Sequence, residues 1–189
     1  MSKSSPSMSR LQKLIFISLL VAQGVVIGLV ENMIPYPFAF APGAKLGLAN
    51  LITIIALFTL PKKDSFLLVW LRLILTTLLG GTISTFLYSM SGALLSYFGM
   101  LLVKALGPKR VSIIGISATG GFMHNVGQLV TASWIAQSWS VLLYLPILSF
   151  FGILSGIAIG IAANFLLHRV QTLRKFQTER ERETKQYWQ

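Results

Sequence analysis

The stretch LQKLIFISLLVAQGVVIGLV, residues 11–30, decides the fold class. After Lys13 it has no charged residue, and as an α-helix rising about 1.5 Å per residue it reaches about 30 Å. That length matches the hydrocarbon core of a bilayer. The run is too long for the apolar region of a signal peptide, and no clear cleavage site of small residues follows it. We therefore predict a retained transmembrane helix over 11–30.

The rest of the chain has the same apolar character. Of its 189 residues, 54% are hydrophobic and 11% are charged, and the mean hydropathy is +0.72, whereas soluble domains carry roughly 25% charged residues. We expect an all-α integral membrane protein with about six transmembrane helices. Its parts are a cytoplasmic tail at 1–10, a membrane domain at 11–168 and a cytoplasmic tail at 169–189 that is expected to be a solvated or frayed helix. Within the membrane domain, further helices are predicted at 46–60, 66–79, 84–106, 112–136 and 141–168.

The positions of Lys and Arg predict the orientation, because basic residues favour cytoplasmic loops. They are frequent in segments 1–13, 61–64, 104–110 and 169–189, while the alternate connections contain only Lys45. Both termini are therefore expected in the cytoplasm, with the chain in the membrane. The net charge of +11 then reflects contact with anionic lipid. No basic stripe alternates with exposed aromatic residues, so nucleic acid is not an expected partner.

A segment rich in proline and aromatic residues, ENMIPYPFAFAPGAK at 31–45, connects the first two predicted helices. Its prolines exclude a regular helix. Tyr36, Phe38 and Phe40 form either an aromatic belt at the membrane surface or a lid over an external pocket, since long irregular loops are often functional.

Small residues recur four apart in the first helix, at Ser18 and Ala22 and again at Gly24 and Gly28. Such spacing lets another helix approach closely. The partner is either a helix of the same chain or a second membrane subunit, and both interpretations stay open.

Arg72 lies within a predicted membrane helix, where a cation is unfavourable by several kcal/mol unless it is paired or hydrated. Its side chain either reaches toward the cytoplasmic surface or pairs with an anion in the bundle. The anion would be Glu31, a helix carbonyl end or a group of a ligand.

Polar residues form one stripe on the fifth predicted helix. His124, Gln128 and Thr131 share a face, with Asn125 beside them, and Asn50 is a further buried amide in the second helix. These groups either form hydrogen bonds between helices or bind a polar solute. No metal site is predicted, because His168 is the other histidine of the chain and no carboxylate pair is available. No cysteine is present to supply thiolates.

Four motifs together resemble one bacterial family, which is labelled both Gx transporter and heptaprenyl diphosphate synthase component I. They are PGAKLGLAN at 42–50, Arg72 followed by Gly80-Gly81, SGALLS at 91–96 and GFMHNVGQ at 121–128. The resemblance covers about residues 11–168. Phe122 and Met123 depart from the small residues of the family pattern but leave the polar stripe intact.

The resemblance implies a bundle like the substrate-binding S components of energy-coupling-factor (ECF) transporters. The first loop would then close over a ligand. Lys45, Asn50, Arg72, His124, Asn125 and Gln128 would approach that ligand. Ser18, Ala22, Gly24 and Gly28 would contact a transmembrane coupling subunit that works with ATPases. Members of the family also occur beside flavin-based electron-transfer components. The resemblance therefore implies that the ligand is a vitamin, a flavin, or a precursor of an isoprenoid or quinone.

The synthase label is tested by the chemistry of prenyl chain elongation, in which Mg²⁺ held by aspartates neutralises the diphosphate. This chain has one aspartate, Asp64, in a segment rich in lysine. We therefore predict no catalytic residue and no cofactor. The expected function is substrate binding for uptake, and the alternative is a non-catalytic accessory subunit of heptaprenyl diphosphate synthase, of quinone biosynthesis or of a flavin-based electron-transfer assembly.

Overall fold

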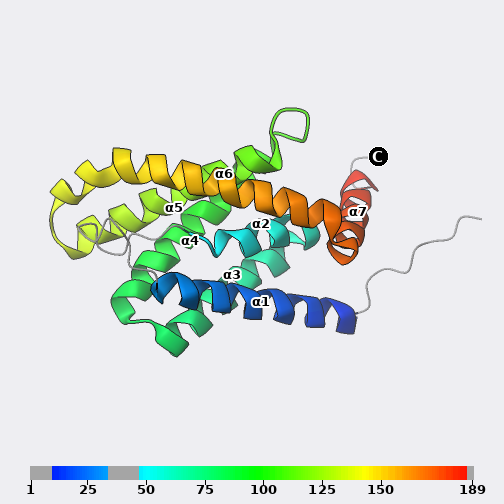
Figure 1. Ribbon diagram of the computed structural model, residues 1–189, viewed down its shortest axis with the longest axis horizontal. Helices are drawn as coiled ribbons and strands as arrows, with labels where there is room; N and C mark the ends of the chain where they lie inside the picture. Colours follow the sequence, from blue (N-terminus) through cyan, green and yellow to red (C-terminus); the bar gives the residue numbers. More distant parts are fainter. Residues whose placement is uncertain (1–9, 34–46, 187–189) are drawn as a thin grey trace, which may run out of the picture.

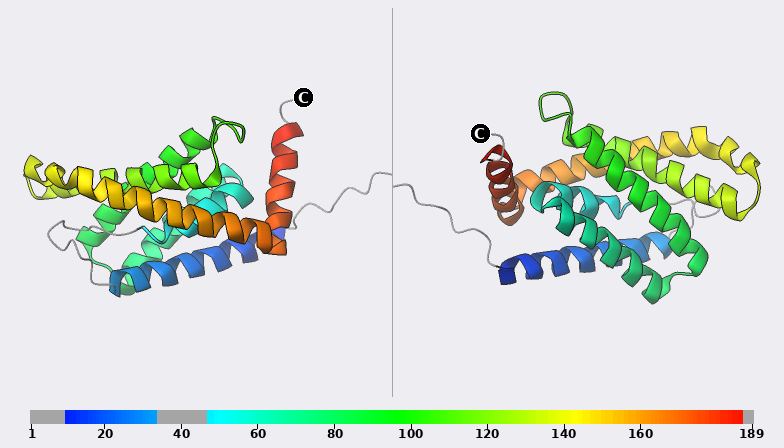
Figure 2. Two further views of the ribbon diagram at one scale, coloured as in Figure 1. Left: turned by 45° about the horizontal axis from the view of Figure 1, so that its top comes forward. Right: turned by 180° about the vertical axis from the view of Figure 1, so that it is seen from behind.

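The computed structural model describes residues 10–33 and 47–186, and every regular element in these ranges is a helix (Figure 1). The long helices lie side by side in one bundle, and the last helix turns away from it (Figure 2). The elements are α1 (Arg10–Met33), α2 (Asn50–Thr59), α3 (Lys62–Gly80), α4 (Ile83–Lys104), α5 (Ile113–Ile135), the 3-10 helix η1 (Trp139–Tyr144), α6 (Leu145–Arg169) and α7 (Gln171–Gln186).

Capping residues explain where the helices begin. Thr82 and Thr85 form a reciprocal capping box at the start of α4, and the Ser112 hydroxyl accepts a hydrogen bond from the Gly115 amide at 3.1 Å at the start of α5. The predicted start of the third helix at residue 66 was wrong by about one turn. The helix begins directly after Pro61 and contains Asp64 in its first turn, where a negative charge is favourable.

The short helix α2 forms the centre of the bundle. Eight of its ten residues are buried, and it packs against α1, α3, α4, α5, α6 and α7. Ten helical residues reach about 15 Å, half of a hydrocarbon core. The helix predicted at 46–60 therefore forms a buried core element that is too short to cross a bilayer by itself.

Three helical segments are long and apolar enough to cross a membrane: Arg10–Met33, Ile83–Lys104 and Trp139–Arg169. Two other predicted spans are long but more polar. Lys62, Lys63 and Arg72 lie in α3, and the polar stripe around His124 lies in α5. These two helices can cross a bilayer only if protein covers their polar faces, and α5 packs extensively between α4 and α6.

Glycine allows the closest helix contact, between α5 and α6. A β-carbon at Gly156 would lie 2.6 Å from the Ser117 carbonyl oxygen and 2.7 Å from Cα of Ala118. Only glycine permits two backbones to approach this closely. Gly152, Gly156 and Gly160 repeat every four residues on α6, which is a stronger signal for close helix packing than the small residues of α1.

The first turns of the predicted C-terminal tail belong to the packed core. Leu173 is 8% exposed, and the ring of Phe176 lies 4.5 Å from the ring of Phe16 in α1. At the same end of the bundle, Lys13 of α1 forms an ion pair with Asp64 of α3. These contacts fix α7 to the beginning of α1, so this part of the tail is not simply solvated.

Candidate functional site

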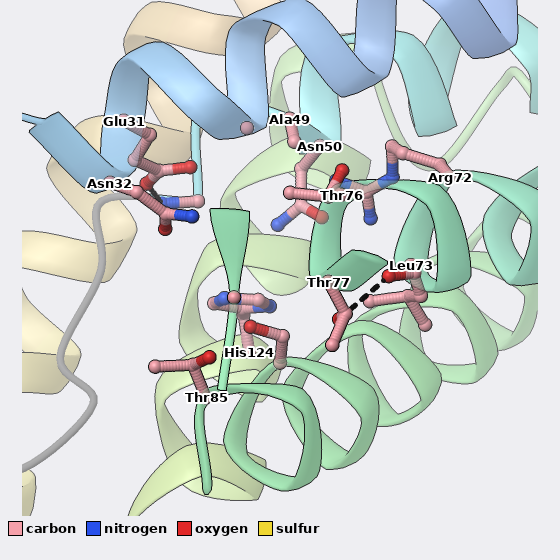
Figure 3. Close-up of a pocket in the computed structure, with 14 residues that line it drawn as sticks. Glu31, Asn32, Ala49, Asn50, Arg72, Leu73, Thr76, Thr77, Thr85 and His124 are labelled. Carbon is pink, nitrogen blue, oxygen red and sulfur yellow. Dashed lines mark hydrogen bonds between the residues drawn. The ribbon is translucent and has the colours of Figure 1, made fainter. Parts of the chain in front are cut away.

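A polar pocket lies where the end of α1, the start of α2, the second half of α3 and the start of α4 converge (Figure 3). His124 of α5 also lines it. The space between the walls is about 510 Å³, including the opening to solvent. The pocket is therefore formed by the bundle itself and brings together residues far apart in the sequence.

Arg72 lies in the wall formed by α3 and is only 7% exposed. Gly24 of α1 leaves room for it, because a β-carbon there would lie 2.7 Å from Cδ of Arg72. Among the described residues, Nε of Arg72 has no hydrogen-bond partner. The Arg72 side chain thus borders the pocket and does not extend toward the beginning of α3, the end that the sequence predicts to be cytoplasmic.

Glu31, at the end of α1, faces the same pocket and is 8% exposed. Its Oε1 accepts hydrogen bonds from the backbone N–H of Gly47 at 2.5 Å and of Leu48 at 3.2 Å. These amides precede α2, and a carboxylate is favourable at a helix N-terminus. Glu31 interacts electrostatically with Arg72, but the two side chains do not form a direct ion pair. The carboxylate of Glu31 is instead stabilised by the backbone amides that precede α2.

Asn50 and His124 complete the polar wall. Asn50 is 4% exposed, and its Nδ2 has no hydrogen-bond partner among the described residues. The His124 ring is accommodated by two glycines, because a β-carbon at Gly92 would lie 3.0 Å from Cε1 and one at Gly47 would lie 3.4 Å from Cδ2. Gly47 also has φ +75°, a conformation that favours glycine. Of the six predicted ligand residues, the pocket brings together Asn50, Arg72 and His124.

The polar stripe of α5 divides between the pocket and the interfaces with neighbouring helices. Nδ2 of Asn125 donates a hydrogen bond to the Leu148 carbonyl of α6 at 2.6 Å. Gln128 is buried beside Gly92 of α4. Neither Asn125 nor Gln128 lines the pocket. Asn125 therefore has the helix-joining role that the sequence left as an alternative.

The prediction missed the hydroxyl groups of the pocket, which come from α3 and α4. Thr76 follows Arg72 by four residues and so shares its helix face, a pattern visible in the sequence. The hydroxyl residues of α4 could not be assigned to the pocket without the packing of the bundle. The missed residues are Thr76, Thr77, Thr85 and Ser89.

The four predicted partner-docking residues of α1 lie in two different environments, one exposed and one buried. Ser18 and Ala22 are exposed, and their contact with a partner stays a prediction. Gly24 and Gly28 are buried against α3, because a β-carbon at Gly28 would lie 3.1 Å from Cγ2 of Thr76. These two glycines pack within the chain, so the expected docking face has to be corrected to its first pair. The predicted ligand residue Lys45 and the lid residues Tyr36, Phe38 and Phe40 lie outside the described residues.

The distribution of polarity defines the class of protein. Many large apolar side chains are exposed on α1 and α6, including Leu19, Val26, Phe150 and Phe165, while Asn50, Arg72, His124 and Gln128 are buried. Apolar outer surfaces around polar interior groups are typical of helical membrane proteins, and three helices have the required length. The molecule is a helical bundle of membrane-protein type with an internal polar pocket.

The family can be named more closely. The chain belongs to the family described as heptaprenyl diphosphate synthase component I, whose family model matches residues 20–166. The match includes every described residue that lines the pocket. No curated protein and no solved structure matches the chain.

Proposed function

We propose that this chain is the solute-binding membrane subunit of an uptake system. The observation that carries the proposal is Arg72, a buried cation that borders a polar pocket and has an unpaired Nε among the described residues. Ionisable groups inside membrane proteins are unfavourable and usually mark a substrate pathway. A small organic solute with hydrogen-bonding groups would compensate this charge.

The proposed topology places about six membrane-embedded helices in a bacterial plasma membrane with both termini in the cytoplasm. Under this topology the end of α1 and the start of α2 face outward, and the pocket between them takes solute from outside. The basic connections support it, because Lys62, Lys63, Lys109 and Arg110 then face the cytoplasm. Capture would proceed from the external surface toward Arg72 and His124.

Energy for release would come from partner subunits. The sequence contains no Gly-rich phosphate-binding loop with the Lys-Ser/Thr ending, so we propose a transmembrane coupling protein and ATPases. The exposed residues Ser18 and Ala22 on α1 are the proposed docking surface. The solute classes implied by the resemblance are vitamins, flavins and isoprenoid or quinone precursors.

A second candidate function is favoured by the family description itself. Component I of a heptaprenyl diphosphate synthase would be a membrane accessory to a catalytic partner. The single aspartate, Asp64, pairs with Lys13, which supports a non-catalytic role. In this alternative the pocket would hold part of a prenyl or quinone substrate for the partner enzyme or for a flavin-based electron-transfer assembly.

The two candidates are separated by purification of the tagged full chain from its native membrane in mild detergent. Mass spectrometry then identifies both the co-purifying subunits and the bound small molecules. The uptake proposal predicts a coupling subunit with ATPases. Recovery of a prenyl synthase without any ATPase would favour the accessory function and reject uptake.

A further inference from the structure

We propose that the pocket holds its solute through a single carboxylate group, bound by Arg72, Asn50 and Thr76. This inference rests on the proposed function as a solute-binding subunit and specifies the chemistry of the solute. It concerns the side of the pocket formed by α2 and α3, where these three side chains lie together (Figure 3).

Three donor groups on this side have no hydrogen-bond partner among the described residues: Nε of Arg72, Nδ2 of Asn50 and Oγ1 of Thr76. Arg72 is 7% exposed and Asn50 is 4% exposed. Buried polar groups are nearly always hydrogen-bonded in folded proteins. Three donors that border one pocket, and that are unpaired within residues 10–33 and 47–186, are therefore available to an acceptor bound there.

A carboxylate satisfies this set of donors. Its two oxygens offer about four acceptor positions, and the planar guanidinium matches the planar carboxylate better than it matches a point charge. The remaining donors, Asn50 and Thr76, can bond the same oxygens from neighbouring positions. A neutral amide would supply one acceptor oxygen and add donors that this side of the pocket does not need.

The charge of the pocket fits one negative group. Arg72 and Glu31 are the fully charged side chains among the described lining residues, and the N–H groups of Gly47 and Leu48 already bind Glu31. The start of α2 adds a partial positive charge of about one half. The formal charges of Arg72 and Glu31 cancel, so the start of α2 leaves a small net positive charge, which attracts a single negative group and offsets part of its charge.

A diphosphate group fits this arrangement poorly. It carries several negative charges and is usually neutralised by Mg²⁺ on carboxylates. Glu31 is occupied by backbone amides, and Asp64 pairs with Lys13 near the beginning of α3, away from the pocket. The described side of the site thus favours an organic acid over a prenyl diphosphate. Hydroxyl groups of Thr85 and Ser89 and the His124 ring would face the body of that acid.

The test uses the full chain in mild detergent with three probes: benzoate, its neutral analogue benzamide, and inorganic pyrophosphate with Mg²⁺. Calorimetry measures affinity, and thermal unfolding measures stabilisation. We expect saturable binding of benzoate and no saturable binding of the other two. Tighter binding of magnesium pyrophosphate than of benzoate would overturn the carboxylate assignment while leaving a small-solute site in place.

Matched variants locate the binding. Thr76→Val removes one donor without changing the side-chain shape, and Thr119→Val in α5 is its control outside the pocket lining. Arg72→Gln and Thr76→Val should weaken benzoate binding by about 10- to 100-fold, as expected for loss of a hydrogen bond to a charged group. Equal affinity in Thr76→Val and Thr119→Val would reject the site, even if Arg72→Gln did not fold. If the wild-type chain bound no probe and carried no solute, the proposed function itself would be rejected.

Discussion

Gly24 of α1 lies directly against the side chain of Arg72 in α3, so that a β-carbon at Gly24 would come within 2.7 Å of Cδ of Arg72. The glycine spacing on α1 therefore serves the pocket. It allows the arginine side chain to lie between two helices and keeps its guanidinium at the pocket wall. This relationship links a common membrane-helix motif to the charged group on which the proposed function depends.

Gly24→Ala should displace the Arg72 side chain and weaken solute binding by about tenfold, the effect of one charge-assisted hydrogen bond. Stability should change little, because the contact is with a flexible side chain. Gly115→Ala in α5 is the matched control, since its β-carbon would meet only the Ser112 hydroxyl at 3.7 Å. Calorimetry with the co-purified solute measures the difference. Unchanged affinity in Gly24→Ala would show that the position of Arg72 does not determine binding.

Neighbouring residues of α5 should have different roles. Asn125→Ala removes the hydrogen bond to the Leu148 carbonyl and should lower the free energy of unfolding by about 1–3 kcal/mol, the effect of leaving a buried group unpaired. Solute affinity should be retained. His124→Ala changes the pocket wall and should lower affinity with a smaller effect on stability. Thermal unfolding and calorimetry on both variants measure stability and solute affinity separately. An Asn125→Ala variant that keeps full stability but no longer binds solute would contradict these assigned roles.

Glu31 should stabilise the start of α2 through both its charge and its hydrogen bonds. Glu31→Gln keeps an acceptor and should reduce local stability by about 0.3–1 kcal/mol, the range for a charge at a helix end. Glu31→Ala leaves the Gly47 and Leu48 amides without this acceptor and should cost about 1–3 kcal/mol. Hydrogen exchange of these amides, read by mass spectrometry, should rise in the order wild type, Gln, Ala. Equal exchange in all three proteins would contradict the geometry.

The proposed orientation predicts opposite labelling of two connections. The chain has no cysteine, so single cysteines at Lys109, between α4 and α5, and at Ser140, in η1, are clean reporters. Both positions are exposed. In intact cells a membrane-impermeant maleimide should label Ser140→Cys but not Lys109→Cys, and both should react after permeabilisation. The reverse pattern would place the N-terminus outside and turn the pocket toward the cytoplasm.

Much of the helix pattern was predictable from the sequence, because apolar runs and their Pro, Gly and capping residues are local features. The helices over Arg10–Met33, Ile83–Lys104 and Ile113–Ile135 lie within a few residues of their predicted ranges. The central position of α2 was not predictable, because an apolar stretch of this length looks similar whether it faces lipid or other helices. Its burial depends on how the other helices surround it.

The site was predictable in part for the same reason. A polar residue within an apolar run can be recognised from the sequence by itself, and Asn50, Arg72 and His124 were identified in this way. The direction in which each side chain points depends on the rotation of its helix. That rotation placed Asn125 against α6 and Gly24 against Arg72, and it brought Thr76 and Ser89 into the wall.

The most direct test of the central claim is native mass spectrometry of the full chain purified from its own membrane, compared with Arg72→Gln. The wild-type protein should carry a bound small organic acid, and the variant should be folded, membrane-inserted and free of that solute. A folded variant that retains the same solute would contradict the claim that Arg72 binds it. A wild-type chain that carries no solute but holds a prenyl synthase would contradict the proposed uptake function.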